Sequence, residues 1–391
     1  MEIVRGKFSI KQIFLHNDNW LRFSDKYKSL IRDDIHFNVE KIFTCKTEAL
    51  GFHKYICLSC GSSLTVPHTC KSRFCSSCGK IAVDNWVQKS TSKFPQLKYQ
   101  HIIFTLPEQL RSLCLINRKL LLNSLFKLAS HSIISWTKEY KNCIPGIISV
   151  IHTFGKDIKF NPHIHILVSS GGLSLDYSSW IPINFFPEKV LKARWKYNVI
   201  SFLRNSFKNN KLQTHKSINF LSSYSTFNSF LNMLYSRYIW YVHIGRKLDS
   251  LSFTIQYVGR YAKRPVLAET RISSFDGRSV SFWFDDKQLH KKVFISLPVE
   301  EFIKRIIRHI PDRHFKQIRY SGIFANRVKT RLCNIVNRIL KTTFHNSRKI
   351  LSWADRMFIQ NGIDPFLCLK CNTPMKLSCI VFPRQIRGAP L

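Results

Sequence analysis

Three histidines between positions 152 and 165 constrain the fold of this chain more than any other feature of its sequence. His163 and His165 are separated by one isoleucine, and ten residues separate His152 from His163. Because side chains alternate between the two faces of a β-strand, His163 and His165 should share one face of a strand at 163–170. His152 ends an apolar run, and a loop with glycine, asparagine and proline follows it. The pattern therefore predicts a hairpin in which three imidazoles bind a metal and leave coordination positions open.

An isolated His-x-His pair has a simpler interpretation, in which both side chains are hydrogen-bonded polar residues at a strand end. The third histidine at hairpin spacing favours a metal site instead. A tyrosine pair later in the chain favours it further.

The charge balance indicates a polyanionic partner. The 391 residues include 61 Lys and Arg but only 23 Asp and Glu, which gives a formal net charge of +38. The excess runs along the whole chain, and a hydrophobic content of 45% is enough for a folded protein with a core. A surface this positive is expected to bind nucleic acid.

The sequence also indicates a cytoplasmic protein without a membrane partner. No stretch approaches the ~18 apolar residues that a membrane span requires, and the first residues lack the apolar core of a signal peptide. Thiols stay reduced in the cytoplasm. The 12 cysteines are therefore expected to bind metal before they form disulfides.

Two Cys-x2-Cys pairs lie close together in the first quarter of the chain. They are Cys57 with Cys60 and Cys75 with Cys78, and a short basic loop precedes the second pair. Two such pairs are typical of a tetrahedral four-cysteine zinc site. Arg73 lies within this region and is expected to contact phosphate.

Further potential zinc ligands remain in the same region: Cys45, Cys70, His53 and His68. They suggest a second zinc site, whose fourth ligand the sequence leaves open. A third pair, Cys368 and Cys371, has no second pair after it. A metal at that pair is therefore not favoured.

Two tyrosines, Tyr257 and Tyr261, lie four positions apart in a basic segment. On a helix, this spacing puts both hydroxyls on one face, and Arg260, Lys263 and Arg264 would surround them with positive charge. A tyrosine can attack a phosphodiester when a metal polarises the phosphate and cations stabilise the transition state. Two tyrosines at this spacing are more often packing aromatics, but the three-histidine pattern in the same chain favours catalysis.

Read together, these segments resemble the two-tyrosine rolling-circle transposases of bacterial insertion sequences, the ninety-one family of HUH nucleases. The similarity keeps its order and spacing over roughly residues 40 to 380. It is carried by Ser72-Arg-Phe-Cys-Ser-Ser-Cys78, His101-Ile-Ile-Phe-Thr-Leu-Pro-Glu108, His152-Thr-Phe-Gly155, Asn161-Pro-His-Ile-His165, Tyr257-Val-Gly-Arg-Tyr261, Ile318-Arg-Tyr-Ser-Gly-Ile-Phe-Ala-Asn326 and Asp364-Pro-Phe-Leu-Cys-Leu-Lys-Cys371. One departure is Phe74-Cys75-Ser76, where the family commonly has His-Cys-Pro.

The resemblance implies an α+β fold. An HUH endonuclease domain, with a central antiparallel sheet flanked by helices, would follow an N-terminal zinc-binding module. The resemblance also implies that His163, His165 and His152 bind a catalytic Mg²⁺ or Mn²⁺ and that Tyr257 and Tyr261 are the nucleophiles. Single-stranded DNA at the ends of the element would be the substrate, and the bacterial cytoplasm, in association with the nucleoid, would be the location.

The function expected on this basis is a transposase that nicks and joins single-stranded DNA through a 5′-phosphotyrosine intermediate. A divalent metal at the histidines would assist it, and structural Zn²⁺ would stabilise the N-terminal module. A plasmid or phage replication initiator and a conjugative relaxase share this chemistry and stay open as alternatives. Two non-enzymes also stay open: an inactive copy that only binds DNA, and a zinc-stabilised RNA-associated protein.

The chain is expected to have three parts. Residues 1–95 would form the zinc-binding and DNA-binding module, 96–270 the nuclease domain, and 271–391 an α/β region with the third cysteine pair. Apolar periodicity predicts helices before residue 44 and at 81–93, 108–140, 188–237 and 299–310. Strands are predicted at 99–106, 147–154, 163–170, 239–243, 271–274, 280–284 and 292–297.

Overall fold

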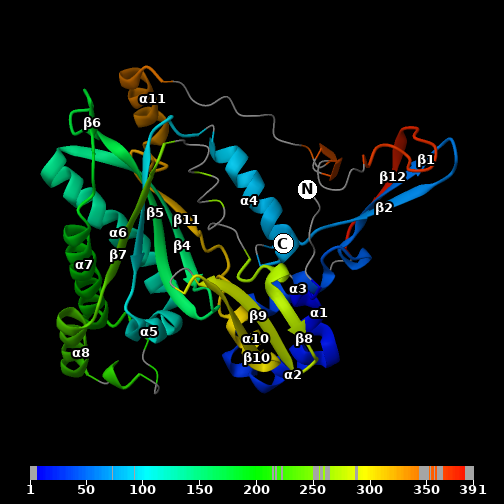
Figure 1. Cartoon of the computed structure of the whole chain (residues 1–391), viewed down its shortest axis with the longest axis horizontal. Helices are drawn as coiled ribbons and strands as arrows, with labels where there is room; N and C mark the ends of the chain where they lie inside the picture. The colour runs from blue at the N-terminus through cyan, green and yellow to red at the C-terminus, as the bar shows by residue number, and fades with distance from the viewer. Residues whose placement is uncertain are drawn as a thin grey trace. The chain divides into compact units, whose positions relative to one another are not determined.

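The structure, a computed structural model (Figure 1), divides into two compact units that are each assembled from segments distant in sequence. Unit 1 comprises Met1–Asn85, Lys263–Pro311 and Arg348–Leu391, and unit 2 comprises Trp86–Ala262 and Asp312–Ser347. The structure describes residues 7–72, 74–91, 93–213, 215, 218–221, 223–249, 255, 259, 265–286, 289–342, 352, 354–355, 357–358 and 364–383. The division into residues 1–95, 96–270 and 271–391 stays a prediction.

A six-stranded sheet forms the centre of unit 2. Its strands are β3 (Tyr99–Thr105), β4 (Cys143–Phe154), β5 (Phe160–Ser174), β6 (Trp180–Pro182), β7 (Tyr241–Leu248) and β11 (Ile318–Gly322). They lie in the order β11–β4–β5–β3–β7, with β6 beside β5, and every neighbouring pair is antiparallel. The central antiparallel sheet expected from the sequence is therefore confirmed.

Helices cover one face of this sheet (Figure 1). They are α5 (Arg111–Ile116), α6 (Arg118–Lys141), α7 (Glu188–Lys208) and α8 (Tyr224–Arg237). Ile164 and Ile166 of β5 pack in one buried cluster with Leu125 of α6, Trp195 of α7 and Leu231 of α8. Alternation along β5 therefore directs its isoleucines toward the helices, on the face opposite the one predicted for His163 and His165.

The opposite face of the sheet carries a second apolar cluster. It contains Leu167 of β5, Val150 of β4 and Tyr99 of β3, together with Ile255 and with Val336 of α11 (Lys329–Leu340). Leu167 lies two positions after a histidine of β5, so the two side chains share this face of the strand. We call it the histidine face.

The helix predicted at 108–140 is interrupted. A 3₁₀ turn at Glu108–Leu110 leads into α5, which ends before Asn117. Asn117 has a non-helical backbone, and its side-chain oxygen accepts a hydrogen bond from the Gln213 amide at 2.7 Å. This polar contact with a distant segment separates α5 from α6, which apolar periodicity alone does not predict.

Unit 1 contains a group of helices, most of them N-terminal, and two small antiparallel sheets. The helices are α1 (Ile10–Leu15), α2 (Asn19–Lys26), α3 (Asp33–Thr44) and α10 (Val299–Ile307). One sheet has the order β10 (Lys291–Pro298), β9 (Ser279–Asp286), β8 (Ile272–Phe275). The other has the order β12 (Met375–Val381), β1 (Phe52–Cys57), β2 (Ser63–Pro67). Helix α4 (Ser76–Thr91) begins directly after Cys75 and contains Cys78.

Hydrogen bonds join the N-terminal helices to the middle segment of unit 1. The amide of Ile10 donates to Glu269 at 3.0 Å, and the guanidinium of Arg32 donates to the carbonyl of Ile310 at 2.8 Å. Lys26 forms an ion pair with Glu300 at 2.9 Å. Residues near position 10 and residues near position 300 therefore fold as one body.

Most predicted elements occur, with shifts at their ends. The strands predicted at 271–274, 280–284 and 292–297 are β8, β9 and β10, and the helix predicted at 299–310 ends at Ile307. Strands β1, β2, β11 and β12 and helix α11 were not predicted. No helix in the described part of the chain has the length and apolar character of a membrane span.

Gly322 is expected to be essential to the packing of β11 on β4. Its φ is +61°, and a Cβ there would lie 1.9 Å from the carbonyl oxygen of Pro145. Gly322→Ala should lower the melting temperature of unit 2 by about 4 °C or more, because left-handed strain and a backbone clash add up. Scanning calorimetry measures this shift.

Gly155→Ala is the matched control within unit 2. Its Cβ would meet only the end of a flexible side chain, Asp157 Oδ1, at 3.0 Å. A small effect is expected for this variant. Equal melting temperatures for the two variants would contradict the steric argument.

Candidate metal centres

Three histidines meet on the histidine face of unit 2. His152 lies on β4, and His163 and His165 lie on β5. One ring nitrogen from each lies within 4.8 Å of the others, and the rings are 4.8–5.4 Å apart. The sequence predicted this convergence, and the structure brings all three side chains together.

The register of the hairpin explains the convergence. His152 and His163 are directly opposite each other on β4 and β5, and Val150 is opposite His165. An irregularity in the ladder between His152 and Phe154 lets the chain turn toward the loop. The side chains of one strand and its neighbour therefore point to one spot on one face.

Asn161 fixes the orientation of one imidazole. Its backbone carbonyl lies 2.7 Å from Nδ1 of His163. A carbonyl oxygen can only accept, so Nδ1 of His163 carries the proton and Nε2 keeps its lone pair. The ring therefore presents Nε2 as a metal ligand.

A fourth histidine, His101 of β3, contacts His165. Its Nε2 lies 3.0 Å from Nδ1 of His165, and the two rings stack with 8° between their planes. His101 was not predicted as a site residue. Its place follows from the strand pairing, because Ile103 is opposite His165 in the ladder and alternation puts His101 on the same face as Ile103.

Burial lowers the pKa of His165, His163 and His101, which keeps these three rings neutral at neutral pH. Burial is the main cause that lowers the pKa of His165 well below its usual value, and the nearby histidines add to it. Burial also lowers the pKa of His163, and it lowers the pKa of His101 to about 4. Because neutral imidazole is the form that binds metal, the site is prepared to accept a cation.

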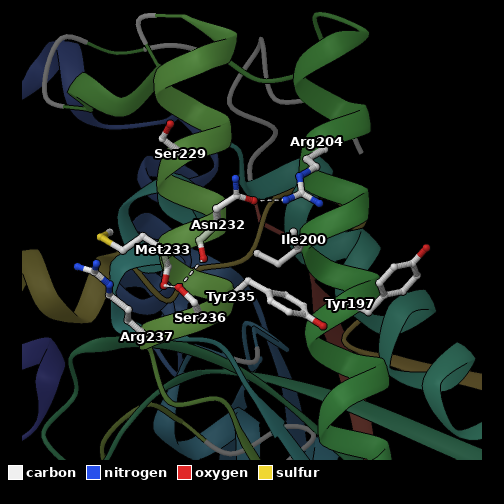
Figure 2. A pocket seen from close by; sticks show the side chains of 9 residues that line it. All are labelled: Tyr197, Ile200, Arg204, Ser229, Asn232, Met233, Tyr235, Ser236 and Arg237. Carbon is white, nitrogen blue, oxygen red and sulfur yellow. Dashed lines mark hydrogen bonds between the residues drawn. The ribbon is translucent and has the colours of Figure 1, made fainter.

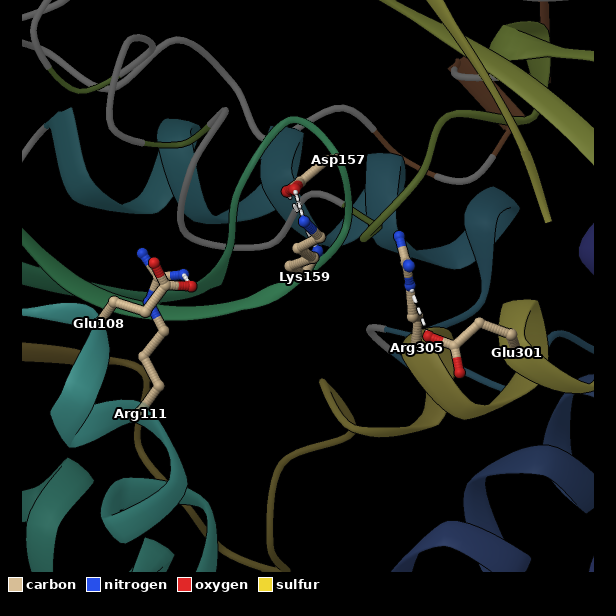
Figure 3. A network of polar contacts seen from close by, with 6 residues as sticks. All are labelled: Glu108, Arg111, Asp157, Lys159, Glu301 and Arg305. Atoms are coloured by element: carbon tan, nitrogen blue, oxygen red, sulfur yellow. Dashed lines mark hydrogen bonds and ion pairs between the residues drawn. The ribbon is translucent and has the colours of Figure 1, made fainter.

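Ion pairs lie in the segments that flank the site (Figure 3). Lys159 lies 3.6 Å from Asp157 in the loop between β4 and β5, and Asp157 also accepts a hydrogen bond from the Lys159 amide. Arg111 of α5 lies 2.9 Å from Glu108. Within unit 1, Figure 3 also draws the pair of Arg305 and Glu301, 2.8 Å apart on α10. Asp157 thus shapes the hairpin loop.

Four buried cysteines of unit 1 form one cluster: Cys45, Cys70, Cys75 and Cys78. The Sγ atoms of Cys45 and Cys78 are 3.6 Å apart, as are those of Cys70 and Cys78. In a tetrahedral site with zinc–sulfur bonds of ~2.3 Å, two sulfur ligands lie about 3.8 Å apart. The donor set and its spacing therefore fit a structural zinc ion.

The pairing predicted from the sequence is wrong. The first Cys-x2-Cys pair, Cys57 and Cys60, does not join Cys75 and Cys78 but meets Cys368 and Cys371. Cys75 and Cys78 instead complete a four-cysteine cluster with Cys45 and Cys70, for which the sequence had left the fourth ligand open. Strand β1 explains the change, because it carries Cys57 to β12 rather than toward α4.

His53 belongs to neither cysteine cluster. Its Nδ1 lies 3.0 Å from Nε2 of His68, the residue that follows β2. The remaining predicted site residues lie outside the described residues: Arg73, Tyr257, Arg260, Tyr261, Lys263 and Arg264.

An open pocket of about 700 Å³ lies between α7 and α8 (Figure 2). Tyr197, Arg204, Tyr235 and Arg237 are among its lining residues. Tyr197 is 63% exposed, and the ammonium of Lys196 lies 3.9 Å from the ring centre of Tyr235. Exposed aromatic rings beside cations suit the stacking of nucleic-acid bases.

Two family models match the chain. The model described as "putative transposase" matches residues 146–331, which include the three histidines. The model described as "transposase zinc-binding domain" matches residues 15–106, which include Cys45, Cys70, Cys75 and Cys78.

Two curated relatives were found. The transposase for insertion sequence element IS801 from Pseudomonas savastanoi pv. phaseolicola is 29% identical over 385 residues, which cover 98% of this chain and 92% of that protein. The "putative transposase y4qJ" of Sinorhizobium fredii is 28% identical over 291 residues, 73% of each chain. No solved structure gives a significant match.

The contact between His163 and Asn161 can be tested directly. In the metal-free protein at neutral pH, the ring of His163 should be neutral and protonated on Nδ1. Nitrogen-15 chemical shifts distinguish the two neutral tautomers, and His163→Gln assigns the signal. His131→Gln, on an exposed position of α6, should leave that signal in place. A proton on Nε2 would contradict the assigned geometry.

Proposed function

Because this chain belongs to the ninety-one family of insertion-sequence transposases, we propose that it nicks and joins single-stranded DNA at the ends of an insertion element. The reaction proceeds through a 5′-phosphotyrosine intermediate. Both curated relatives are named as transposases. That supports a transposase over the replication initiator and the relaxase that share the chemistry.

The convergence of His152, His163 and His165 carries this proposal, since their ligand atoms lie within 4.8 Å of one another. Three imidazoles on one side leave coordination positions for substrate oxygen. Mg²⁺ is a hard cation that prefers oxygen ligands, so Mn²⁺ fits this donor set better. When bound, the ion supplies Lewis-acid polarisation of the scissile phosphate.

Tyr257 or Tyr261 is the proposed nucleophile. Its phenolic oxygen forms a bond to phosphorus while the bond from phosphorus to the 3′ oxygen breaks. The phenol loses its proton, and the departing 3′ oxygen gains one. The products are a 5′-phosphotyrosine and a free 3′-hydroxyl. One phosphodiester replaces another, so resealing by a 3′-hydroxyl needs no nucleotide cofactor. Arg260, Lys263 and Arg264 are proposed to contact the phosphates.

Ile255 supports this assignment. It is fully buried in the apolar cluster of the histidine face, together with Leu167 and Val150. Leu167 follows His165 by two positions, and Val150 precedes His152 by two positions. The chain is thus anchored on the histidine face two positions before Tyr257 in sequence.

The pocket between α7 and α8 is proposed as a contact surface for single-stranded DNA. Stacking on exposed tyrosines tolerates any base, and the neighbouring cations attract the backbone. A net charge of +38 adds sequence-independent attraction. In the zinc-binding domain, the cluster of Cys45, Cys70, Cys75 and Cys78 is proposed to hold a structural zinc ion.

A covalent adduct tests the enzyme assignment. Purified protein with Mn²⁺ and labelled single strands from the element ends should give a shifted band on a denaturing gel. Tyr257→Phe/Tyr261→Phe should abolish the band, because phenylalanine has no attacking oxygen. Tyr140→Phe/Tyr177→Phe, at two exposed positions, should keep it. An adduct that survived in the first double variant would exclude both tyrosines as nucleophiles.

We propose that Nε2 of His101 accepts a hydrogen bond from Nδ1–H of His165. This contact orients the ring of His165 and leaves its Nε2 free to bind the metal. His101→Ala should weaken Mn²⁺ binding by about 10- to 100-fold, the usual loss when such a partner is removed. Titration followed by electron paramagnetic resonance measures the free ion. His131→Ala is the control, and unchanged affinity in His101→Ala would refute the positioning role.

A further inference from the structure

We propose that Cys57, Cys60, Cys368 and Cys371 bind one structural Zn²⁺, so that two segments 308 residues apart in sequence close into a single zinc ribbon. Cys368 and Cys371 lie outside residues 15–106, which match the zinc-binding domain model. These four cysteines form a group separate from the buried cluster of Cys45, Cys70, Cys75 and Cys78. The site does not depend on the proposed nuclease chemistry.

The two Cys-x2-Cys turns have the same backbone construction. The amide of Cys57 donates to Ser62 at 2.8 Å, and the amide of Cys368 donates to Thr373 at 2.9 Å. Gly61 and Asn372, each directly after the second cysteine, have φ values of +69° and +55°. Their amides donate to the carbonyls of Cys57 and Cys368 at 3.0 and 2.8 Å. Two equivalent turns are what a symmetric four-cysteine site requires.

Strand pairing brings the two turns together. Strand β1 leads into the first turn, and β12 leaves the second. The two strands pair antiparallel with Cys57 opposite Met375. In Figure 1 the blue β1 and the red β12 lie side by side. The ladder thus aligns the first turn with the second, although no local sequence signal links them.

The sulfur atoms are arranged as four ligands of one ion. Sγ of Cys371 lies 3.3 Å from Cys57 and 3.5 Å from Cys60, and Cys60 lies 3.5 Å from Cys368. Cys371 and Cys60 each contact two other sulfurs, whereas disulfides would form separate pairs at ~2.04 Å. Sulfur–sulfur distances of about 3.8 Å are expected for thiolates around a tetrahedral zinc ion.

Hydrogen bonds to the sulfurs supply the surroundings that thiolates need. The hydroxyl of Thr373 lies 3.1 Å from the sulfurs of both Cys57 and Cys371, and the amide of Lys370 donates to Cys368 at 3.4 Å. Such contacts stabilise the negative charge of the ligands. Four cysteines leave no open coordination position, so this site is structural.

The small size of the local core explains why a metal is required. The buried residues of this cluster are Tyr55, Cys57, Cys368 and Met375. Leu64 and Val66 are only partly buried against them, and most of β12 is exposed. A core of this size cannot hold two distant segments together, whereas metal binding supplies folding free energy directly.

Zinc analysis of the full-length protein tests the proposal. Cys368→Ser/Cys371→Ser should lose one of the two zinc ions that the two cysteine clusters predict. Cys379→Ser is the matched control, because Cys379 is an exposed cysteine of β12 outside both clusters. Its zinc content should equal that of the unmodified chain. Full zinc retention in the double variant would overturn the proposal.

Alkylation of the unmodified protein gives a second measurement that does not depend on the folding of a variant. Cys60, Cys371 and Cys379 are all exposed. With zinc bound, iodoacetamide should modify Cys379 at least 10-fold faster than Cys60 or Cys371, and a chelator should remove the difference. Equal rates before chelation would overturn the site. So would protection that only a reductant removes, because disulfides would then be its cause.

Discussion

The antiparallel pairing of β4 with β5 is the contact on which the candidate site depends. It places His152 opposite His163 and extends to Cys143 opposite Ser174, so its register is set over many residues. A slip by one residue would reverse the faces of all side chains on one strand. Ile164 and Ile166 would then leave the helix layer, and His165 would enter it. Burial of apolar side chains on one face thus fixes the histidines on the other.

The same packing gives the imidazoles their chemical state. The histidine face carries the apolar cluster that includes Ile255 and residues of α11, and burial is the main reason why the pKa of His165 and that of His163 are lowered. A neutral ring has one nitrogen that donates and one that accepts. Asn161 takes the donor nitrogen of His163, so the accepting nitrogen faces its neighbours. Core packing and ligand orientation therefore have a common origin in the strand pair.

The sequence predicted features that depend on local periodicity. Alternation from His163 onward was enough to assign a strand, its two faces and the convergence of the three histidines. His101 obeys the same rule but needs the pairing of β3 with β5 before its position is apparent. The grouping of cysteines failed for a different reason. A Cys-x2-Cys turn is a local feature, but its partner is chosen by β1 and β12, whose pairing spans most of the chain. Spacing in the sequence favoured the nearer pair.

The pairing of β1 with β12 has a consequence for how the protein is made. Met375 is opposite Cys57 in the ladder, so 375 − 57 = 318 residues are added before the partner of β1 begins to emerge. At ~5–20 residues per second, a ribosome needs roughly 16 to 64 s for this interval. During that time β2 protects one edge of β1, while the other edge has unpaired backbone groups that could pair with another chain. Unit 1 is therefore completed late in synthesis, after the whole of the central sheet of unit 2 has been made.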